Sequence, residues 1–150
     1  MENKYYIPEI SELFVGYECE KQINFGYESF NDGKEIWLPI KIGYKDEKEG
    51  AYTNELSNII NEFDDGCTPI KTPFLRKEQI VDEGWENILE MDEDGAFEAD
   101  KSSQGVLFLI RWSDDKMLSV YEDSYKNRIF YGNCRCINDF RQITKKFLNI

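Results

Sequence analysis

Three short hydrophobic runs followed by a helical pattern make up the last third of the chain. The runs occupy residues 105–113, 117–123 and 127–136, and polar turn residues separate the first two. Runs of this length between turn residues predict antiparallel β-strands. The segment 138–148 has hydrophobic side chains at helical spacing, namely Phe140, Ile143, Phe147 and Leu148. We therefore predict a C-terminal β-β-β-α unit whose helix lies across one face of the strands.

The first half of the chain gives a mixed pattern. Residues 13–23 and 35–44 predict two strands, and Pro39 indicates that the second lies at a sheet edge, because proline cannot donate a hydrogen bond to a neighbouring strand. Residues 54–63 predict a helix that ends at the turn signal of residues 64–66. Its single hydrophobic stripe consists of Leu56, Ile59, Ile60 and Phe63.

The middle of the chain links these two parts. Residues 67–74 contain two prolines and predict an extended connector. Residues 75–85 predict a short helix closed by Gly84, and a strand from Trp85 to about Met91 follows it. The side chains expected to point inward from the short helix are Leu75, Ile80 and Val81.

Length and composition agree with this set of elements. The chain has 150 residues, of which 41% are hydrophobic and 15% aromatic, and this is enough apolar material for a core. Short sequential strands with a few helices are typical of an α+β fold rather than a parallel sheet. We predict an antiparallel sheet with a C-terminal β-β-β-α unit and two or three short helices packed on it, in a single domain over residues 1–150.

The absence of histidine and the spacing of the cysteines narrow the chemistry. Without histidine there is no Ser-His-Asp or Cys-His catalysis and no His-ligated metal site. The spacing of the cysteines is not C-x-x-C and does not favour zinc or a redox motif. We expect them to be reduced, in a cytoplasmic protein with no catalytic residue, no metal and no cofactor. They are Cys19, Cys67, Cys134 and Cys136.

Three stretches in a fixed order carry a family resemblance. They are "YYIPEISELFVGYECE" at residues 5–20, "PFLRKEQIVDEGW" at residues 73–85 and "INDFRQITKKFLNI" at residues 137–150. The chain resembles a family of small uncharacterised proteins carried by phages and prophages of Bacteroidetes. These share a Tyr-Ile-Pro lead, a Phe-x-Gly-Tyr/Phe-Glu strand and a Lys-Glu-x-Ile-x-x-x-Gly-Trp segment. The stretches cover roughly a third of the chain. The resemblance implies a mobile-element accessory protein, and the long insert between Gly43 and Thr72 departs from the family.

A run of acidic residues is the most prominent charge feature. Between Glu78 and Asp100 there are ten acidic residues and no lysine or arginine. A folded surface with dense carboxylates can compete for the nucleic-acid-binding groove of another protein. The run is equally typical of a solvated hairpin or turn that keeps the protein soluble, and both interpretations stay open. The candidate partner-binding residues are Glu83, Glu86, Glu90, Asp92, Glu93, Asp94, Glu98 and Asp100.

Calcium binding is a weaker interpretation of the same stretch. With Gly95 at position 6 of an EF-hand loop, Glu90, Asp92 and Asp94 take positions 1, 3 and 5. Lys101 then stands at position 12, where the motif requires a bidentate glutamate. The flanking residues also predict strands rather than the two helices of an EF-hand. The sequence therefore does not favour a calcium site.

The C-terminal end is basic, with six Lys and Arg residues and one acidic residue between Lys126 and Lys146. A nucleic-acid contact would use Arg135, Arg141, Lys145 and Lys146. We favour a helix with a solvated outer face, because the field of the whole protein opposes nucleic acid. A third alternative is self-association, in which the basic end of one copy meets the acidic stretch of another.

Charge and resemblance together lead to a functional expectation. The net charge of −12 attracts basic partners and repels nucleic acid and membranes. We expect a phage-encoded, non-enzymatic protein of the host cytoplasm that binds a basic, nucleic-acid-handling defence protein, such as a CRISPR effector, and inhibits it by nucleic-acid mimicry. The alternative is a phage structural or assembly module without an inhibitory role.

Overall fold

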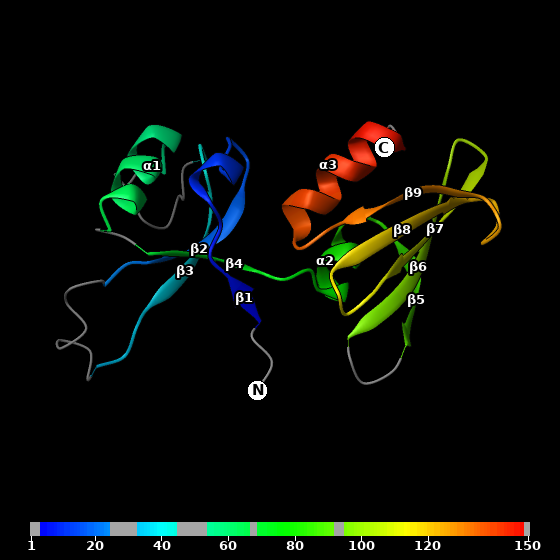
Figure 1. Cartoon of the computed structure of the whole chain (residues 1–150), viewed down its shortest axis with the longest axis horizontal. Coiled ribbons are helices and arrows are strands. Elements are labelled where there is room, and N and C mark those ends of the chain that lie inside the picture. The colour runs from blue at the N-terminus through cyan, green and yellow to red at the C-terminus, as the bar shows by residue number, and fades with distance from the viewer. Residues whose placement is uncertain (1–3, 25–32, 45–53, 67–68, 92–94, 149–150) are drawn as a thin grey trace. The chain divides into compact units, whose positions relative to one another are not determined.

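The computed structural model describes residues 4–24, 33–44, 54–66, 69–91 and 95–148. They form two compact units, an N-terminal unit, Met1–Phe74, and a C-terminal unit, Leu75–Ile150 (Figure 1). Each unit has its own antiparallel sheet and its own cluster of buried hydrophobic residues. The α+β class is confirmed. The sequence predicts a single domain over residues 1–150, and the structure adds that this length contains two hydrophobic cores.

The N-terminal unit is built on a four-stranded sheet in the order β1-β4-β2-β3. Strand β3 is therefore at an edge, as Pro39 predicts, and Pro39 itself is exposed. Buried side chains such as Tyr17, Cys19, Ile42 and Ile70 form the core of this unit. Its elements are β1 (Tyr5–Tyr6), the 3-10 helix η1 (Ile10–Glu12), β2 (Glu18–Gln22), β3 (Trp37–Lys41), α1 (Leu56–Asp64) and β4 (Ile70–Pro73).

Helix α1 confirms the predicted hydrophobic stripe. Ile59 is 2% exposed, and the other three stripe residues, Leu56, Ile60 and Phe63, pack half-buried against the same core. The helix ends where predicted, since Asp65 is its C-cap and Gly66 follows with φ of 69°. A left-handed residue after the last turn is the common way for a helix to stop.

Strand β4 replaces the connector predicted over residues 67–74. It pairs with β1 through Tyr5↔Pro73 and with β2 through Glu20↔Lys71, so it lies inside the sheet. The two prolines do not prevent this. One precedes the strand and the other ends it, so the backbone N–H groups between them remain available to neighbouring strands.

The C-terminal unit is a five-stranded meander in the order β5-β6-β7-β8-β9, followed by helix α3 (Figure 1). Strands β7, β8 and β9 with α3 confirm the predicted β-β-β-α unit. Helix α2 precedes the sheet. The elements are α2 (Lys77–Asp82), β5 (Glu86–Met91), β6 (Ala96–Ser103), β7 (Val106–Trp112), β8 (Met117–Glu122), β9 (Arg128–Asn133) and α3 (Ile137–Phe147).

The core of the C-terminal unit lies between the helices and one face of the sheet. Trp85 and Phe140 meet edge-to-face with ring centroids 5.7 Å apart, and Phe97 stacks on Trp112 at 5.6 Å. Helix α3 contributes Ile137, Phe140 and Ile143, and its end adds Leu148. In α2, Ile80 is fully buried as predicted, but Val81 is 52% exposed, so its inward placement is wrong. The helix has only six residues, and its single buried position faces the sheet.

Candidate protein-binding surface

The two faces of the C-terminal sheet differ in what covers them. On the core face, side chains from β6, β7 and β8 join those of α2 and α3 in one buried cluster. The opposite face, which we call the open face, carries the alternate residues of the same strands, because successive side chains of a strand point to opposite sides. Among the described residues, no helix contributes to the open face. It is the side of the sheet that helices α2 and α3 leave uncovered.

Cross-strand pairing arranges the open face in rows. The first, the Asp100 row, runs across all five strands, because residues directly opposite each other share a face. The second, the Glu98 row, runs parallel to it. From β5 to β9 the Asp100 row reads Glu86, Asp100, Leu109, Tyr121, Arg128. The Glu98 row reads Leu89, Glu98, Arg111, Ser119, Tyr131.

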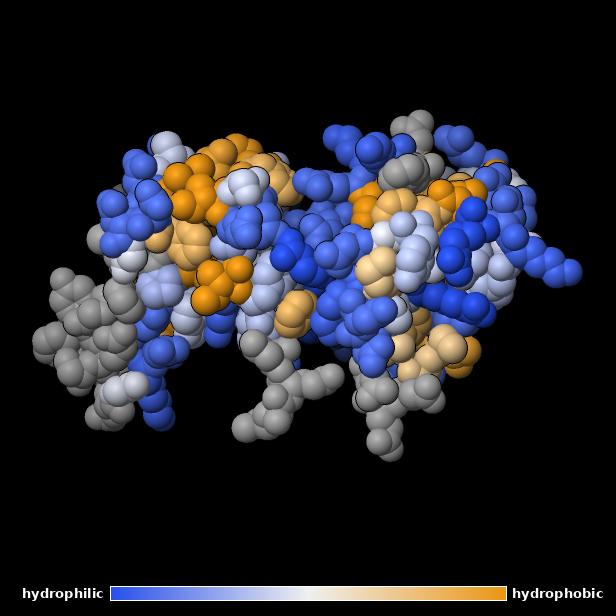
Figure 2. Space-filling model, in the orientation of Figure 1, coloured by the Kyte–Doolittle hydropathy of each residue, from blue (hydrophilic) through white to orange (hydrophobic). Residues whose placement is uncertain are grey.

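Large hydrophobic side chains remain exposed on the open face. Leu89 is 59% exposed and Tyr131 is 57% exposed, at opposite ends of the Glu98 row. Met91 and Leu107 are also exposed, and so is Tyr125 from the β8–β9 connection. These are five of the ten exposed large hydrophobics among the described residues, so exposed apolar surface is concentrated on this face. The surface of the C-terminal unit that Figure 2 shows is mostly hydrophilic, with small hydrophobic areas.

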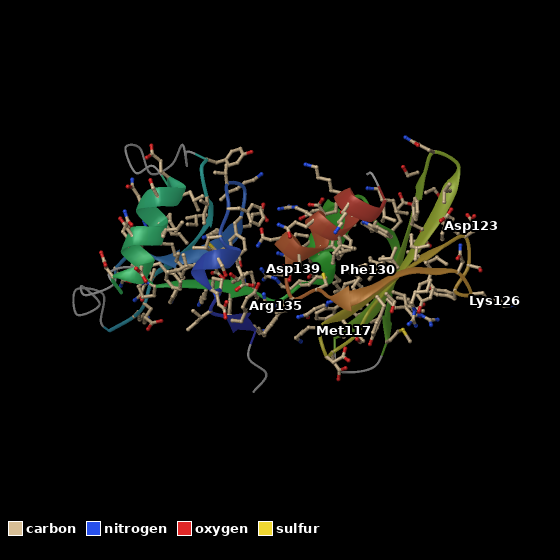
Figure 3. All side chains as sticks on the ribbon, turned by 45° about the horizontal axis from the view of Figure 1, so that its top comes forward. Met117, Asp123, Lys126, Phe130, Arg135 and Asp139 are labelled. Carbon is tan, nitrogen blue, oxygen red and sulfur yellow. The ribbon has the colours of Figure 1, made fainter. Side chains whose placement is uncertain are left out.

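Tyrosine and arginine side chains stack across the middle of the open face. The guanidinium of Arg111 lies 3.9 Å from the ring centroid of Tyr125, and that ring meets Tyr121 edge-to-face at 5.1 Å. The guanidinium of Arg128 lies 5.6 Å from the Tyr121 ring and 5.0 Å from the Tyr131 ring. Figure 3 labels Asp123 and Lys126, which bracket the connection that carries Tyr125. Tyrosine and arginine, with tryptophan, are the residues most enriched at binding hot spots.

Glu98 holds this stack in place. Its carboxylate accepts a hydrogen bond of 2.6 Å from Arg111 Nε and one of 3.0 Å from the Tyr125 hydroxyl. Burial of the Tyr125 hydroxyl and then its bond to Glu98 raise the pKa of Tyr125 above its ordinary value. Burial alone would raise the pKa of Tyr121, but hydrogen bonds with Arg128 and Ser119 and the charge of Arg128 lower it. Because Arg111 forms an ion pair with Glu98, its positive charge is neutralised within the open face.

Arg128 differs from Arg111 in its surroundings. It is exposed at the β9 edge and donates a hydrogen bond of 3.3 Å to the Tyr121 hydroxyl. None of the carboxylates in the described part of the chain forms an ion pair with it. Contact with two aromatic rings restricts the movement of a guanidinium. It can therefore receive a carboxylate from outside the unit.

The predicted partner-binding carboxylates are divided between both sides of the sheet and helix α2. Glu83 pairs with Arg141 at 2.7 Å, Glu90 with Lys77, and Glu98 with Arg111. Asp100 accepts hydrogen bonds of 3.0 and 3.1 Å from the Asn87 amide, and Glu86 is exposed beside it. Asp92, Glu93 and Asp94 lie outside the described residues.

The acidic run at residues 78–100 lies next to basic side chains in the folded protein. Residues 78–100 contain no lysine or arginine, yet folding brings three bases to their carboxylates from positions outside the run. The negative charge at Glu83, Glu90 and Glu98 is therefore offset by these bases. On the open face, uncompensated charge remains at Glu86 and Asp100, because Asn87 is neutral.

The surplus of negative charge lies mainly in the other unit. Residues 1–74 contain 7 Lys and Arg against 15 Asp and Glu, a net charge of −8, whereas residues 75–150 contain 11 against 15, a net charge of −4. Seven bases can neutralise at most seven of fifteen carboxylates. At least eight carboxylates in the N-terminal unit therefore have no base within that unit to offset them.

The structure also bears on two other interpretations, a calcium loop at the acidic stretch and a nucleic-acid contact at the basic end. Strand β6 begins at Ala96, so the second half of a would-be EF-hand loop is a strand, and Lys101 donates a hydrogen bond of 2.9 Å to the Glu83 carbonyl. Within the described ranges, no cluster of three metal-ligating side chains occurs. At the basic end, Arg135 lies 3.9 Å from Asp139 (Figure 3), and Arg141 is paired with Glu83. Lys145 and Lys146 are exposed on the last turn of α3.

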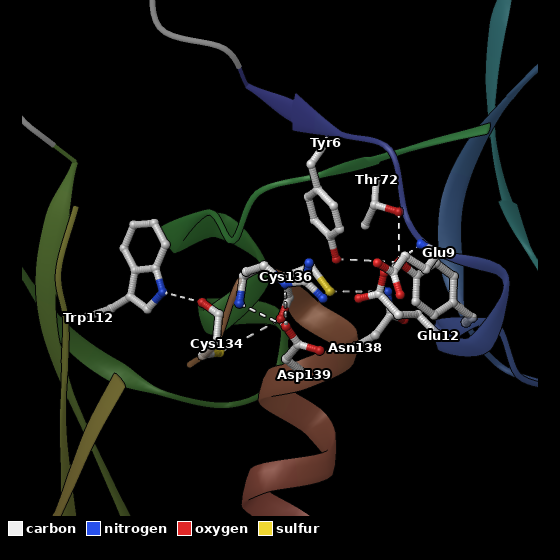
Figure 4. Close-up of polar contacts among 11 residues, drawn as sticks. Tyr6, Glu9, Glu12, Thr72, Trp112, Cys134, Cys136, Asn138 and Asp139 are labelled. Atoms are coloured by element: carbon white, nitrogen blue, oxygen red, sulfur yellow. Dashed lines mark hydrogen bonds and ion pairs between the residues drawn. The ribbon is translucent and has the colours of Figure 1, made fainter. Parts of the chain in front are cut away.

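The described cysteines are buried and free. The Trp112 indole donates a hydrogen bond of 2.8 Å to the Cys134 carbonyl, which fixes the start of the segment leading into α3 (Figure 4). Burial, together with the nearby charge of Asp139, raises the pKa of the Cys134 thiol far above its ordinary value. Burial likewise raises the pKa of Cys19 to about 12. Both thiols remain protonated near neutral pH, and a protonated thiol is a poor nucleophile.

We expect Cys19 and Cys134 to resist iodoacetamide in the native protein at pH 8, because burial both excludes the reagent and removes the reactive thiolate. Peptide mass spectrometry after timed labelling measures each site separately. The same chain in guanidinium chloride, where all four cysteines should be labelled, is the control. Labelling of either native thiol at the rate of the unfolded chain would contradict the buried, protonated state.

Comparison with protein-family models, curated proteins and solved structures finds no match to the chain. Within the part of the chain that is described, no helix is both long and apolar enough to cross a bilayer. Sequence patterns missed the stack of Tyr121, Tyr125 and Arg128, because only strand pairing and the β8–β9 connection bring these residues together. The signal that points to the open face is the alternation within β7, where buried residues fall on every second position. Strand β8 does not show it, because four consecutive residues are buried there.

Proposed function

We propose that the chain acts by binding a basic, nucleic-acid-handling protein of the host and inhibiting it, without catalysis of its own. The observation that carries the proposal is the charge surplus: a net charge of −12, of which −8 belongs to residues 1–74 and cannot be offset within that unit. The family resemblance to phage and prophage accessory proteins supports an inhibitory role. The second candidate, a phage structural or assembly module, shares the same resemblance but makes no use of the charge.

The physical basis is competition for a basic groove. A nucleic-acid-binding groove is lined with Lys and Arg that neutralise phosphates, and an acidic protein can take the place of those phosphates. Long-range attraction raises the rate of encounter, and salt weakens it steeply. Inhibition by this route needs no cofactor and no reaction step. It requires carboxylates that internal bases leave uncompensated. This favours the N-terminal unit over Glu83, Glu90 and Glu98, each of which is paired with a base. Asp92, Glu93 and Asp94 remain candidates on the sequence alone.

Affinity capture from host lysate at low and high salt tests the proposal. We expect a basic nucleic-acid-binding protein to be retained at low salt and released at high salt, and the purified chain to block that protein's binding to nucleic acid. The combined reversal Asp92→Lys, Glu93→Lys and Asp94→Lys should weaken the complex by at least about tenfold.

A charge-matched variant controls for net charge alone. The reversal of Glu78, Asp82 and Asp114 to lysine changes the net charge equally at exposed positions outside residues 92–94 of the sequence. If both triple variants bind as the natural chain does, the reversed carboxylates do not make the contact, and if the complex is also insensitive to salt, nucleic-acid mimicry is wrong. If the chain is instead found in purified phage particles and inhibits nothing, the structural role is the correct one.

A further inference from the structure

We propose that the open face of the C-terminal sheet is a dimer interface, occupied by the open face of a second copy of this chain. The proposal goes beyond the function above, because it concerns a different surface and a different partner. Its basis is the arrangement of charge, apolar and aromatic side chains within the two rows of the face.

The Asp100 row is complementary to itself. It begins with two carboxylates, Glu86 on β5 and Asp100 on β6, passes through Leu109 on β7, and ends with Tyr121 and the guanidinium of Arg128 on β9. Strand β7 is the middle strand of the five. A two-fold axis lying between two copies, parallel to β7, would set β5 of one copy over β9 of the other. The carboxylates would then face Arg128, twice per dimer, as an isologous interface requires.

The Glu98 row fits the same axis. Its ends are Leu89 and Tyr131, the two most exposed hydrophobic residues on the face, at 59% and 57%. The axis would pack the leucine of one copy on the tyrosine ring of the other. At the centre of the row, Arg111 would approach its own counterpart, but its charge is already offset by Glu98 at 2.6 Å. Face-to-face packing of two sheets in this way forms a sandwich with interdigitated side chains.

Charge distribution favours a second copy over a basic partner at this surface. The face has both signs, and each sign lies near a different edge. A uniformly basic partner would gain at Glu86 and Asp100 but meet Arg128, which no described carboxylate neutralises. A second copy satisfies both ends at once. In each contact Glu86 and Asp100 meet one guanidinium, so Arg128→Glu replaces attraction by repulsion and Glu86→Arg sets two guanidinium groups against each other with only Asp100 left to offset them.

Two complementary variants provide the test, with oligomeric state measured by sedimentation equilibrium and native mass spectrometry. We expect the natural chain to dimerise. Glu86→Arg should raise the dimer dissociation constant by at least about tenfold, and so should Arg128→Glu. An equimolar mixture of the two variants should recover a heterodimer, because each reversed site then meets its opposite charge on the other chain. Recovery by mixing cannot result from misfolding.

A pair of matched variants tests the apolar part of the interface. Tyr131→Ser should also weaken the dimer, whereas Val81→Ser removes a side chain of similar exposure from helix α2 and should not. A monomeric natural chain at high micromolar concentration would overturn the proposal, as would two variants that dimerise normally or a mixture that stays monomeric. None of these outcomes bears on capture of a basic host protein, which depends on other carboxylates, so the two proposals can fail separately.

Discussion

Replacement of Trp85 by alanine should lower the free energy of unfolding of the C-terminal unit by about 3–5 kcal/mol. Trp85 is 2% exposed and packs edge-to-face on Phe140, so the substitution leaves a large cavity between the start of β5 and helix α3. Trp85 also directly follows the turn at Gly84, where the chain leaves α2 with φ of 87°, so the substitution affects the link between α2 and β5. Urea unfolding followed by circular dichroism measures the loss.

Two comparisons make this result specific. Val81→Ala truncates a 52% exposed side chain one turn earlier and should cost less than about 0.5 kcal/mol. Hydrogen exchange measured on peptides shows where the destabilisation falls: faster exchange is expected in β5–β9 and α3. A Trp85→Ala chain as stable as the natural one would mean that the side chain is not in the core.

Replacement of Ile59 by alanine should destabilise the N-terminal unit by about 2–5 kcal/mol. Ile59 is the single fully buried residue of α1, and the rest of the stripe is only half-buried. A nine-residue helix is not stable alone in water, so its existence depends on this contact with the sheet. Loss of helical signal at lower urea concentration and faster exchange in residues 56–64 are the measurements.

The neighbouring position gives the control. Asn58 is exposed on the same helix, and Asn58→Ala should be neutral or slightly stabilising because alanine is the better helix former. If the two variants unfold alike, α1 is not held by its buried face. Because Trp85 and Ile59 belong to separate clusters, exchange in each variant should rise mainly in its own unit.

Hydrophobic periodicity predicted the elements whose pattern is strong and complete within a short stretch of the chain. Strands β7 and β8 and helix α3 lie within two residues of their predicted positions, because buried runs and the α3 stripe are unambiguous. Pro39 also indicated its edge correctly, since the rule depends only on a missing N–H group. These features depend on a residue and its near neighbours, which is what a sequence pattern records.

The errors in secondary structure arise where pairing with strands distant in the sequence determines whether a segment is a strand. Strand β4 is short and bounded by prolines, and only its partners β1 and β2 make it a strand. Strand β6 was not predicted because of its charged residues. Phe97 and Ala99 point to the core while Glu98 and Asp100 point away, but the acidic residues made the segment resemble a turn. In a half-buried strand, alternation is the stronger signal and charge the weaker one.

The candidate site shows the same limit. The positions of the carboxylates were available from the sequence, but their ion pairs were not, since Arg141 lies 58 residues from Glu83 and Arg111 lies 13 residues from Glu98. The stack of Tyr125 on Arg111 likewise needs a connection that folds back over the sheet. Local charge counts cannot predict such pairings, because the partners are brought together only by the tertiary fold.

Both outermost strand pairs of the C-terminal sheet are irregular. Pairing shifts between Glu86 and Leu89 at the β5 edge, where Asn87 has φ of 52°, and again between Val120 and Tyr121 beside β9. Bulges twist an edge so that it presents a poor template for another strand. Growth by edge-to-edge strand addition, the route to cross-β fibrils, is thereby disfavoured at each end of the sheet. We therefore expect the protein to accumulate to high concentration during overproduction while remaining free of fibrils.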